Sequence, residues 1–140
     1  MVGPYAGQRD EIFAQWKIDM AELATCANVV MKVGGMTMPY SGYGWEKLPK
    51  PPTSSELADE LGQWYDYLVQ TFGADRCMYE SNFPPDNASA PYRTIWNMFK
   101  IIAARAGYSE KEKADLFHDT AVRVYRIGEA RPEVGVLGKI

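Results

Sequence analysis

Apolar residues recur at three- and four-residue steps in four parts of the chain, as on one face of an amphipathic helix. Two of these parts open with a capping box, formed by Thr53 with Glu56 and by Ser109 with Glu112. The pattern predicts helices over residues 9–26, 53–72 and 92–106, and a last helical segment from Ser109 onward.

Two short apolar runs lie between the predicted helices. Val29–Val33 is rich in β-branched residues and ends at Gly34, which is typical of a buried parallel strand, and Arg76–Glu80 is a second, shorter run. Strands that alternate with helices predict an α/β fold with a parallel sheet. Two strands cannot form an independent sheet that is buried on both faces, so the sequence resembles part of a larger fold.

Residues 34–52 are predicted to form a loop that is longer than most connections in compact domains. The loop contains four glycines and four prolines, together with Tyr40, Tyr43 and Trp45. Long loops are often functional, so these three aromatic side chains are candidates to line an apolar substrate pocket. Simple packing of the loop is the alternative.

The composition excludes several classes of protein. Of 140 residues, 46% are hydrophobic and 24% charged, and 15 Lys and Arg against 18 Asp and Glu give a net charge of −3. This is typical of a globular protein and unlike a disordered chain or a nucleic-acid-binding protein. No apolar run approaches the roughly 18–20 residues that span a bilayer, and no signal-peptide pattern is present, so we expect a cytoplasmic protein without a membrane partner. Cys26 and Cys77 match no metal-binding spacing.

Three segments resemble consecutive parts of the amidohydrolase-2 family. Phe72–Pro84, with its Gly-Ala-Asp-Arg turn and its Glu-Ser-Asn-Phe-Pro sequence, is similar to the last barrel strand of that family. Asn28–Gly35 is similar to the strand before it, and Phe117–Ala121 with Tyr125 is similar to the closing helix. The resemblance implies a single partial (β/α) unit over residues 1–140. This unit corresponds to the last two βα units of a TIM barrel plus C-terminal helices, with a loosely held tail at 128–140.

The resemblance also bears on cofactors. Family members often use a divalent metal such as zinc or manganese, but the family's histidine ligands on earlier strands have no counterpart in this chain. The familiar carboxylate of the last strand aligns with Asn82, a neutral amide. We therefore expect no metal site and no cofactor for this chain.

Lys32, Glu80 and Asn82 are the candidate catalytic residues. Side chains alternate along a strand, so Glu80 and Asn82 share a face, and Lys32 should meet Glu80 from the neighbouring strand. Such a pair can supply acid and base chemistry, but a buried structural ion pair is the interpretation that the residues favour. Asn82 either holds a substrate oxygen or caps the turn that follows it.

Two hypotheses for the function follow from the sequence. The first is an amidohydrolase-type hydrolase of an ester, lactone or amide bond, or the C-terminal part of one, with a small-molecule substrate and its site at the carboxyl ends of the strands. The second is a non-catalytic, truncated barrel remnant that acts as an oligomeric or interaction module. Either protein would exist as a homo-oligomer or together with the remainder of a barrel.

We predict that the isolated chain is not a stable monomer, because its strands would offer unpaired N–H and C=O groups at their outer edges. Size-exclusion chromatography with light scattering measures this property. A compact monomer that unfolds cooperatively would contradict the prediction.

We also predict that the chain purifies without stoichiometric transition metal. Near the strand ends it offers the carboxylates of Glu80 and Asp86 without imidazole support, which makes a weak site for zinc. Asn82→Asp alone should not create tight binding, because other ligands would still be missing. Elemental analysis is the measurement, and one equivalent of tightly held zinc, iron or manganese per chain would refute the prediction.

Overall fold

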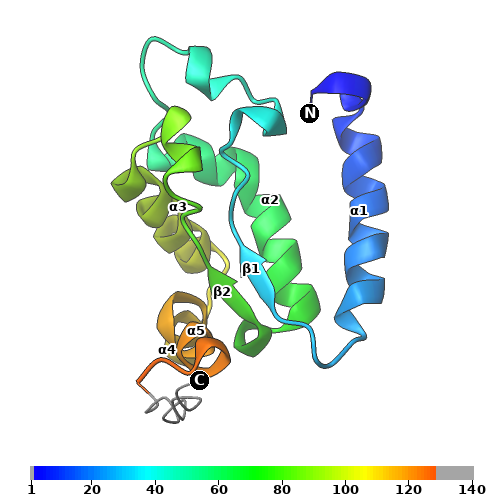
Figure 1. Ribbon diagram of the computed structural model, residues 1–140, viewed down its shortest axis with the longest axis vertical. Coiled ribbons are helices and arrows are strands. Elements are labelled where there is room, and N and C mark those ends of the chain that lie inside the picture. The colour runs from blue at the N-terminus through cyan, green and yellow to red at the C-terminus, as the bar shows by residue number, and fades with distance from the viewer. Residues whose placement is uncertain (1, 129–140) are drawn as a thin grey trace, which may run out of the picture.

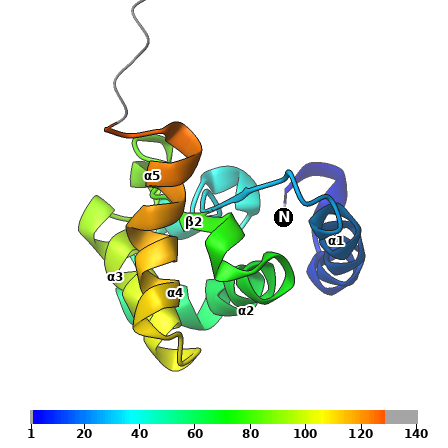
Figure 2. The ribbon, with the colours of Figure 1, turned by 90° about the horizontal axis from the view of Figure 1, so that it is seen from below.

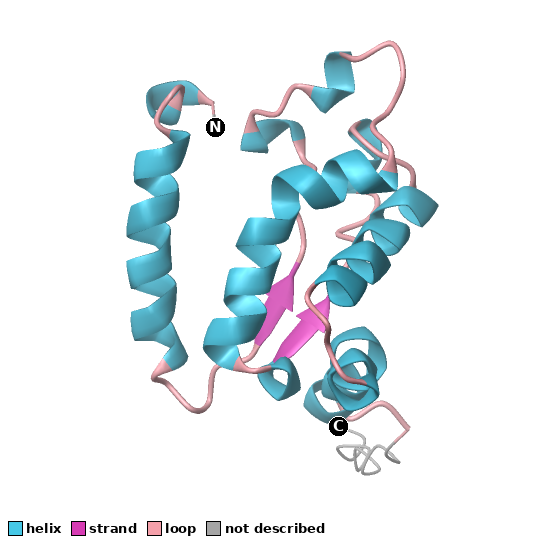
Figure 3. Cartoon of the chain, turned by 180° about the vertical axis from the view of Figure 1, so that it is seen from behind, coloured by secondary structure: helices cyan, strands magenta, loops and turns pink. Residues whose placement is uncertain are grey.

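Two short parallel strands lie at the centre of the protein, with helices packed beside them (Figure 1). The computed structural model describes residues 2–128. Strand β1, Met31–Val33, pairs with β2, Cys77–Tyr79, in a register that sets Lys32 opposite Met78. Both strands point toward the end of the molecule where the loop of residues 34–52 lies (Figure 3). The expected α/β class with parallel strands is confirmed, although helices make up most of the structure.

The helices follow the predicted segments closely. They are α1 (Arg9–Ala24), α2 (Ser54–Phe72), α3 (Tyr92–Arg105), α4 (Glu110–Ala114) and α5 (Thr120–Tyr125). Both predicted capping boxes are present, at the starts of α2 and α4. The last helical segment is one continuous run, in which a π-helical stretch at residues 115–119 joins α4 to α5. The loop between β1 and α2 contains two single-turn 3₁₀ helices, at Pro39–Ser41 and Trp45–Lys47.

The hydrophobic core lies between α2, α3 and β2. One face of α2 is buried along its whole length, and β2 is covered on both faces. Aromatic rings join the layers: Tyr79 of β2 stacks on Phe99 of α3 with centroids 4.3 Å apart, and it meets the edge of Phe117 at 5.0 Å. Large rings contribute strongly to core stability through the apolar area they bury. The side chains of β2 are therefore held from two sides.

Helix α1 is an exception to the predicted burial. Its apolar stripe packs against α2, where the rings of Phe13 and Trp16 lie 4.2 and 5.0 Å from that of Trp64. No residue of α1 is fully buried, however, and Leu23 of this helix is 37% exposed. Figure 2 shows the cause, because α1 stands at the side of the molecule and packs against α2.

Strand β1 departs from its prediction in the same way. Val33 is completely buried, but Met31 is only half-buried and Lys32 is exposed. A strand with the composition of a buried one thus lies at an edge of the sheet.

The predicted loose tail lies outside the described residues apart from Gly128. Within residues 2–128, none of the helices has the length and apolar character required to cross a membrane.

Candidate functional site

An ion pair joins the two strands near their carboxyl ends. Lys32 Nζ lies 2.7 Å from Glu80 Oε2. The register explains this contact: Lys32 is opposite Met78, and Glu80, two residues beyond Met78, projects from the same face. The prediction that the two side chains meet is confirmed. The expectation of a buried pair is wrong, because the side chain of Lys32 is 53% exposed and that of Glu80 is 24% exposed.

The carboxylate of Glu80 determines the protonation of Lys32. Its hydrogen bond to the ammonium group and its negative charge together raise the pKa of Lys32 above the ordinary value of 10.5, and the small effect of burial opposes this shift. Lys32 therefore stays protonated at neutral pH. It can donate hydrogen bonds and stabilise negative charge, but it is not poised to act as a general base.

Asn82 lies in a tight turn directly after β2. Its backbone adopts the left-handed conformation, with φ 48°. The peptide bond between the two residues that follow it, Phe83 and Pro84, is cis. The Asn82 side-chain amide donates a hydrogen bond to Asp86 Oδ1 at 3.1 Å, and the Asp86 N–H donates to the Asn82 carbonyl at 3.3 Å. Asn82 thus holds the turn, which is one of its two predicted roles, two residues after Glu80.

Asp86 is a further residue of this site that the sequence pattern did not single out as catalytic. It is only 1% exposed, and burial raises the pKa of its carboxyl above the ordinary value of 3.8. Hydrogen bonding from Asn82 and Thr37 opposes the rise, whereas the negative charge of Glu80 adds to it. The Asn82-x₃-Asp86 spacing after a strand was the one signal in the sequence that could have indicated the contact.

Two glycines after β1 bring the following loop close to the end of β2. A Cβ atom at Gly34 would lie 2.3 Å from the carbonyl oxygen of Glu80, which is far inside contact distance. Gly35 has φ +80°, a conformation that favours glycine, and its Cβ position is 3.5 Å from the side-chain nitrogen of Asn82. The Gly34–Gly35 pair therefore allows the start of the loop to pass close to Glu80 and Asn82.

The three aromatic residues of the loop do not form one cluster. Tyr43 and Trp45 stack face to face with centroids 4.2 Å apart, and the guanidinium of Arg9 lies 3.8 Å from the Tyr43 ring centroid. Tyr40 is 78% exposed and stands apart from this stack. Trp45 lines a hollow of about 430 Å³ at the start of α2. Their predicted role in substrate binding stays a prediction.

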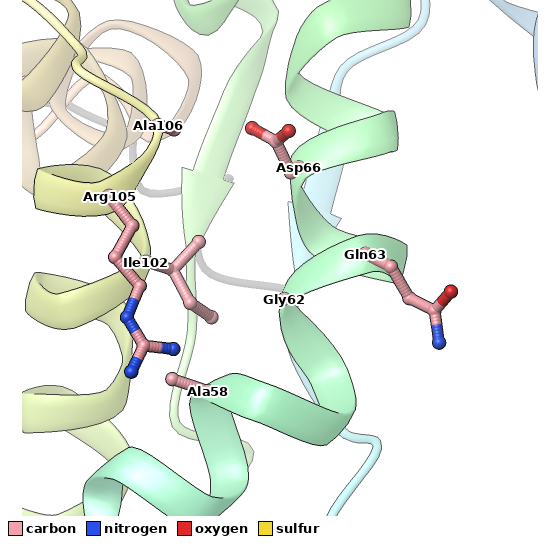
Figure 4. A pocket seen from close by; sticks show the side chains of 7 residues that line it. All are labelled: Ala58, Gly62, Gln63, Asp66, Ile102, Arg105 and Ala106. Atoms are coloured by element: carbon pink, nitrogen blue, oxygen red, sulfur yellow. The ribbon is translucent and has the colours of Figure 1, made fainter.

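Two other hollows differ in their relation to the ion pair. A groove of about 340 Å³ between α1, α2 and β1 is lined by Lys32 itself, together with apolar side chains. A smaller hollow of about 210 Å³ lies between α2 and α3, where Arg105 extends toward Ala58 and Asp66 lies at the other end (Figure 4). Arg105 is already paired with Asp59 at 2.7 Å, and the residues that line this smaller hollow come from α2, α3 and Ala106. Of the two hollows, the groove is therefore the one that belongs with the strand-end site.

The side chains at the strand ends do not fit the divalent metal that the resemblance implies. Within residues 2–128, no three His, Cys, Asp or Glu side chains lie close enough to hold a metal ion together. Glu80 is bound to Lys32, and Asp86 accepts from Asn82. His118 is exposed and lies 2.9 Å from Asp119 in the π-helical stretch. No catalytic step through a metal is therefore derived from these residues.

We predict that a double-mutant cycle with Lys32→Met and Glu80→Gln gives a coupling energy of about 0.5–1 kcal/mol, because half of the Lys32 side chain is exposed. Folding raises the pKa of Lys32. The stabilisation of the folded protein by the ion pair is therefore complete below the pKa that Lys32 has in the unfolded chain, and it is lost as the pH rises through the pKa that Lys32 has in the folded protein. Urea unfolding at pH 7 and above pH 10.5 measures both effects. The exposed pair Arg105–Asp59 is the matched control. Strictly additive losses would show that the groups do not interact.

We predict that Asp86→Asn stabilises the protein at neutral pH. The new amide keeps an oxygen for Asn82 and removes a buried charge. Folding raises the pKa of Asp86 above the ordinary value of 3.8. The gain in stability of the variant is therefore complete above the pKa that Asp86 has in the folded protein, and it disappears below the pKa that Asp86 has in the unfolded chain. Thermal unfolding between pH 3 and pH 8 tests this, with Asp10→Asn at an exposed aspartate of α1 as control. A variant that is less stable than the parent at pH 7 would contradict the prediction.

Comparisons with known proteins agree with these observations. The sequence profile of the amidohydrolase family matches residues 3–127. The uncharacterized protein y4mH of Sinorhizobium fredii is 33% identical over 115 residues, which cover 82% of this chain and 34% of that protein. Two crystal structures of an amidohydrolase from Burkholderia multivorans have the same fold over this region. The one with bound HEPES gives a TM-score of 0.72 at 24% identity, covering 87% of this chain and 40% of that one. The one with bound zinc gives a TM-score of 0.70 at 26% identity, covering 84% of this chain and 38% of that one.

The chain therefore spans between a third and two fifths of the length of these relatives. The profile match extends over both strands and all five helices, and it includes the turn that carries Asn82. Together with the shared fold, this match shows that the chain belongs to the amidohydrolase family.

Proposed function

We propose that the chain is the C-terminal part of an amidohydrolase-type hydrolase and supplies the last two βα units of a TIM barrel. The parallel pair β1–β2 with α2 as its crossover supports this position, as does the share of the longer relatives that the chain spans. In TIM barrels, catalytic groups gather at the carboxyl ends of the strands. Lys32, Glu80 and Asn82 lie at that end of this sheet.

The observation that carries the proposal is the half-exposed ion pair at the strand ends. Lys32 is held 2.7 Å from Glu80 but keeps 53% of its side chain accessible. An accessible ammonium can receive a substrate, whereas a fully covered one cannot. In acyl transfer, negative charge develops on the carbonyl oxygen, and an ammonium in a fixed position stabilises that charge. Glu80 is the positioning residue that keeps Lys32 protonated and in place.

The substrate class is a small molecule with an ester, lactone or amide bond. Asn82 follows Glu80 in the turn after β2, and its amide orients the substrate or the attacking water; its bond to Asp86 fixes the direction of that amide. Tyr43 and Trp45 form a flat apolar wall in the loop after β1, and Tyr40 is free to fold over a bound molecule. The remaining catalytic groups come from the part of the barrel that this chain does not contain.

The alternative is a non-catalytic barrel remnant that serves as an interaction module. One observation favours it: the polar side chains at the strand ends already partner one another, Lys32 with Glu80 and Asn82 with Asp86. The two functions differ in whether the strand-end residues affect turnover.

A chimera tests the proposal. This chain would replace the matching segment of the Sinorhizobium fredii relative, a segment that makes up 34% of that protein. The chimera and the parent relative are assayed on p-nitrophenyl esters, lactones and anilides, with and without zinc or manganese. We expect hydrolysis by the chimera, with kcat/KM lowered about 100-fold by Lys32→Met or Asn82→Ala. The matched control is Lys100→Met, at an exposed lysine of α3.

The outcomes separate the two functions. Circular dichroism first establishes that each variant is folded. Hydrolysis that Lys32→Met and Asn82→Ala leave unchanged would remove these residues from the site. A folded chimera that hydrolyses nothing, beside a parent that is active, would support the non-catalytic module.

A further inference from the structure

The hollow at the start of α2 combines an aromatic wall with acidic side chains. Its volume of about 430 Å³ lies within the range of roughly 300–1,000 Å³ that is typical of small-molecule sites. Trp45, Leu48 and the buried Pro52 form its apolar side. Three carboxylates and a single ammonium group also line it, so the hollow carries a net negative charge. A hollow with these two properties is suited to an organic cation rather than to an anion.

One face of the Trp45 ring is already covered. The Tyr43 ring stacks on it with centroids 4.2 Å apart and planes 2° apart. The guanidinium of Arg9 lies 3.8 Å from the centroid of Tyr43, and it must lie on the face that Trp45 leaves free. Trp45 therefore has its other face and its edge to present to the hollow. An indole face is the best aromatic surface for a cation, and this stack already holds one cation at its opposite end.

The three carboxylates of the hollow differ in whether they are engaged. Glu56 Oε2 accepts a hydrogen bond from the Thr53 N–H at 2.7 Å, as part of the capping box of α2. Asp59 Oδ1 is paired with Arg105 at 2.7 Å. In the part of the chain that the structure describes, Glu60 has neither an ion pair nor a side-chain hydrogen bond. Glu60 is therefore the carboxylate that is available to a ligand.

Glu60 also lies near the aromatic stack. Burial is the main cause that raises the pKa of Tyr43, and the cation of Arg9 opposes the rise. The negative charge of Glu60 adds to it, so this carboxylate is close enough to act on the Tyr43 ring electrostatically. Trp45 and Glu60 thus reach the hollow from different elements, the loop and α2, and supply the two attractions that an organic cation needs.

The number of free acceptors decides between two kinds of ammonium ion. A primary ammonium has three N–H donors and is strongly hydrated, so it needs several acceptors to replace its water. A quaternary ammonium has no N–H donor, and its alkyl groups are satisfied by contact with an aromatic face. With one free carboxylate and an apolar side, the hollow matches the second kind.

We propose that the hollow binds a small quaternary ammonium ion, with its alkyl groups against Trp45 and Leu48 and its charge balanced by Glu60. Lys50 opposes binding, because it lines the same hollow with a like charge. None of the residues that line the groove beside β1 lines this hollow. The inference concerns binding alone and does not rest on the proposed hydrolysis.

The experiment titrates the full chain with choline and, as a matched probe, with 3,3-dimethylbutan-1-ol. The two molecules have the same shape, but a carbon atom replaces the charged nitrogen in the second. Isothermal titration calorimetry measures the affinity, and the NMR signal of the Trp45 indole N–H locates the site. We expect choline to bind about tenfold more tightly than the neutral alcohol, and more weakly as the salt concentration rises.

Variants of the lining residues test the two attractions separately. We expect Glu60→Gln to weaken choline binding about threefold and Lys50→Met to strengthen it by a similar factor. Trp45→Leu removes the aromatic face and should weaken binding about tenfold, whereas Trp45→Phe keeps a ring and should weaken it about threefold. The matched control Glu22→Gln removes an exposed carboxylate of α1 and should leave the affinity unchanged. Circular dichroism establishes that each variant is folded.

Other results would overturn the inference. Equal affinities for choline and the alcohol would show that charge plays no part. An equal loss in Glu60→Gln and Glu22→Gln would reveal a general effect of net charge instead of a site. Choline that does not bind at millimolar concentrations, or that leaves the Trp45 signal unmoved, would exclude the hollow. None of these readouts uses catalysis, so failure here is distinct from failure of the proposed function.

Discussion

The parallel pairing of β1 with β2 is the contact on which the rest of the structure depends. Its register, Lys32 opposite Met78, places Lys32 and Glu80 on one face. Parallel direction brings the two strand ends to the same end of the molecule, where the Asn82 turn also lies. A shift of one residue would turn every side chain of one strand to the other face. Gly34 secures the arrangement, because any larger residue would collide with the backbone of Glu80.

Burial is unequal on the two sides of this pair. β2 is enclosed by α2, α3 and the π-helical stretch, whereas β1 and α1 are half-covered. The polar groups at the strand ends show a related contrast. Lys32 reaches solvent and is held in its charged form by Glu80, while Asp86 is buried and its pKa is raised toward the neutral form. One site thus combines a fixed cation with a carboxyl that binds its proton more tightly than usual.

Much of the fold could be predicted from local patterns. Helical periodicity and two capping boxes identified the helices, and alternation along the strands predicted the contact of Lys32 with Glu80, which is confirmed. The exposure of that pair could not be predicted, because it depends on which elements cover the strands. The role of Asp86 was missed for a similar reason: its burial arises from a turn whose path after Asn82 is not encoded in any periodicity.

The sequence by itself determined the helices, the strands, their parallel α/β order and the resemblance to a family, because these follow from periodicity, capping and short motifs. Tertiary structure alone decided which predicted faces are buried. The stripe of α1 and the composition of β1 are those of interior elements, yet both are left half-open in residues 2–128. The physical reason is that a residue pattern encodes the face that can be buried, whereas burial itself requires a neighbouring element to cover that face.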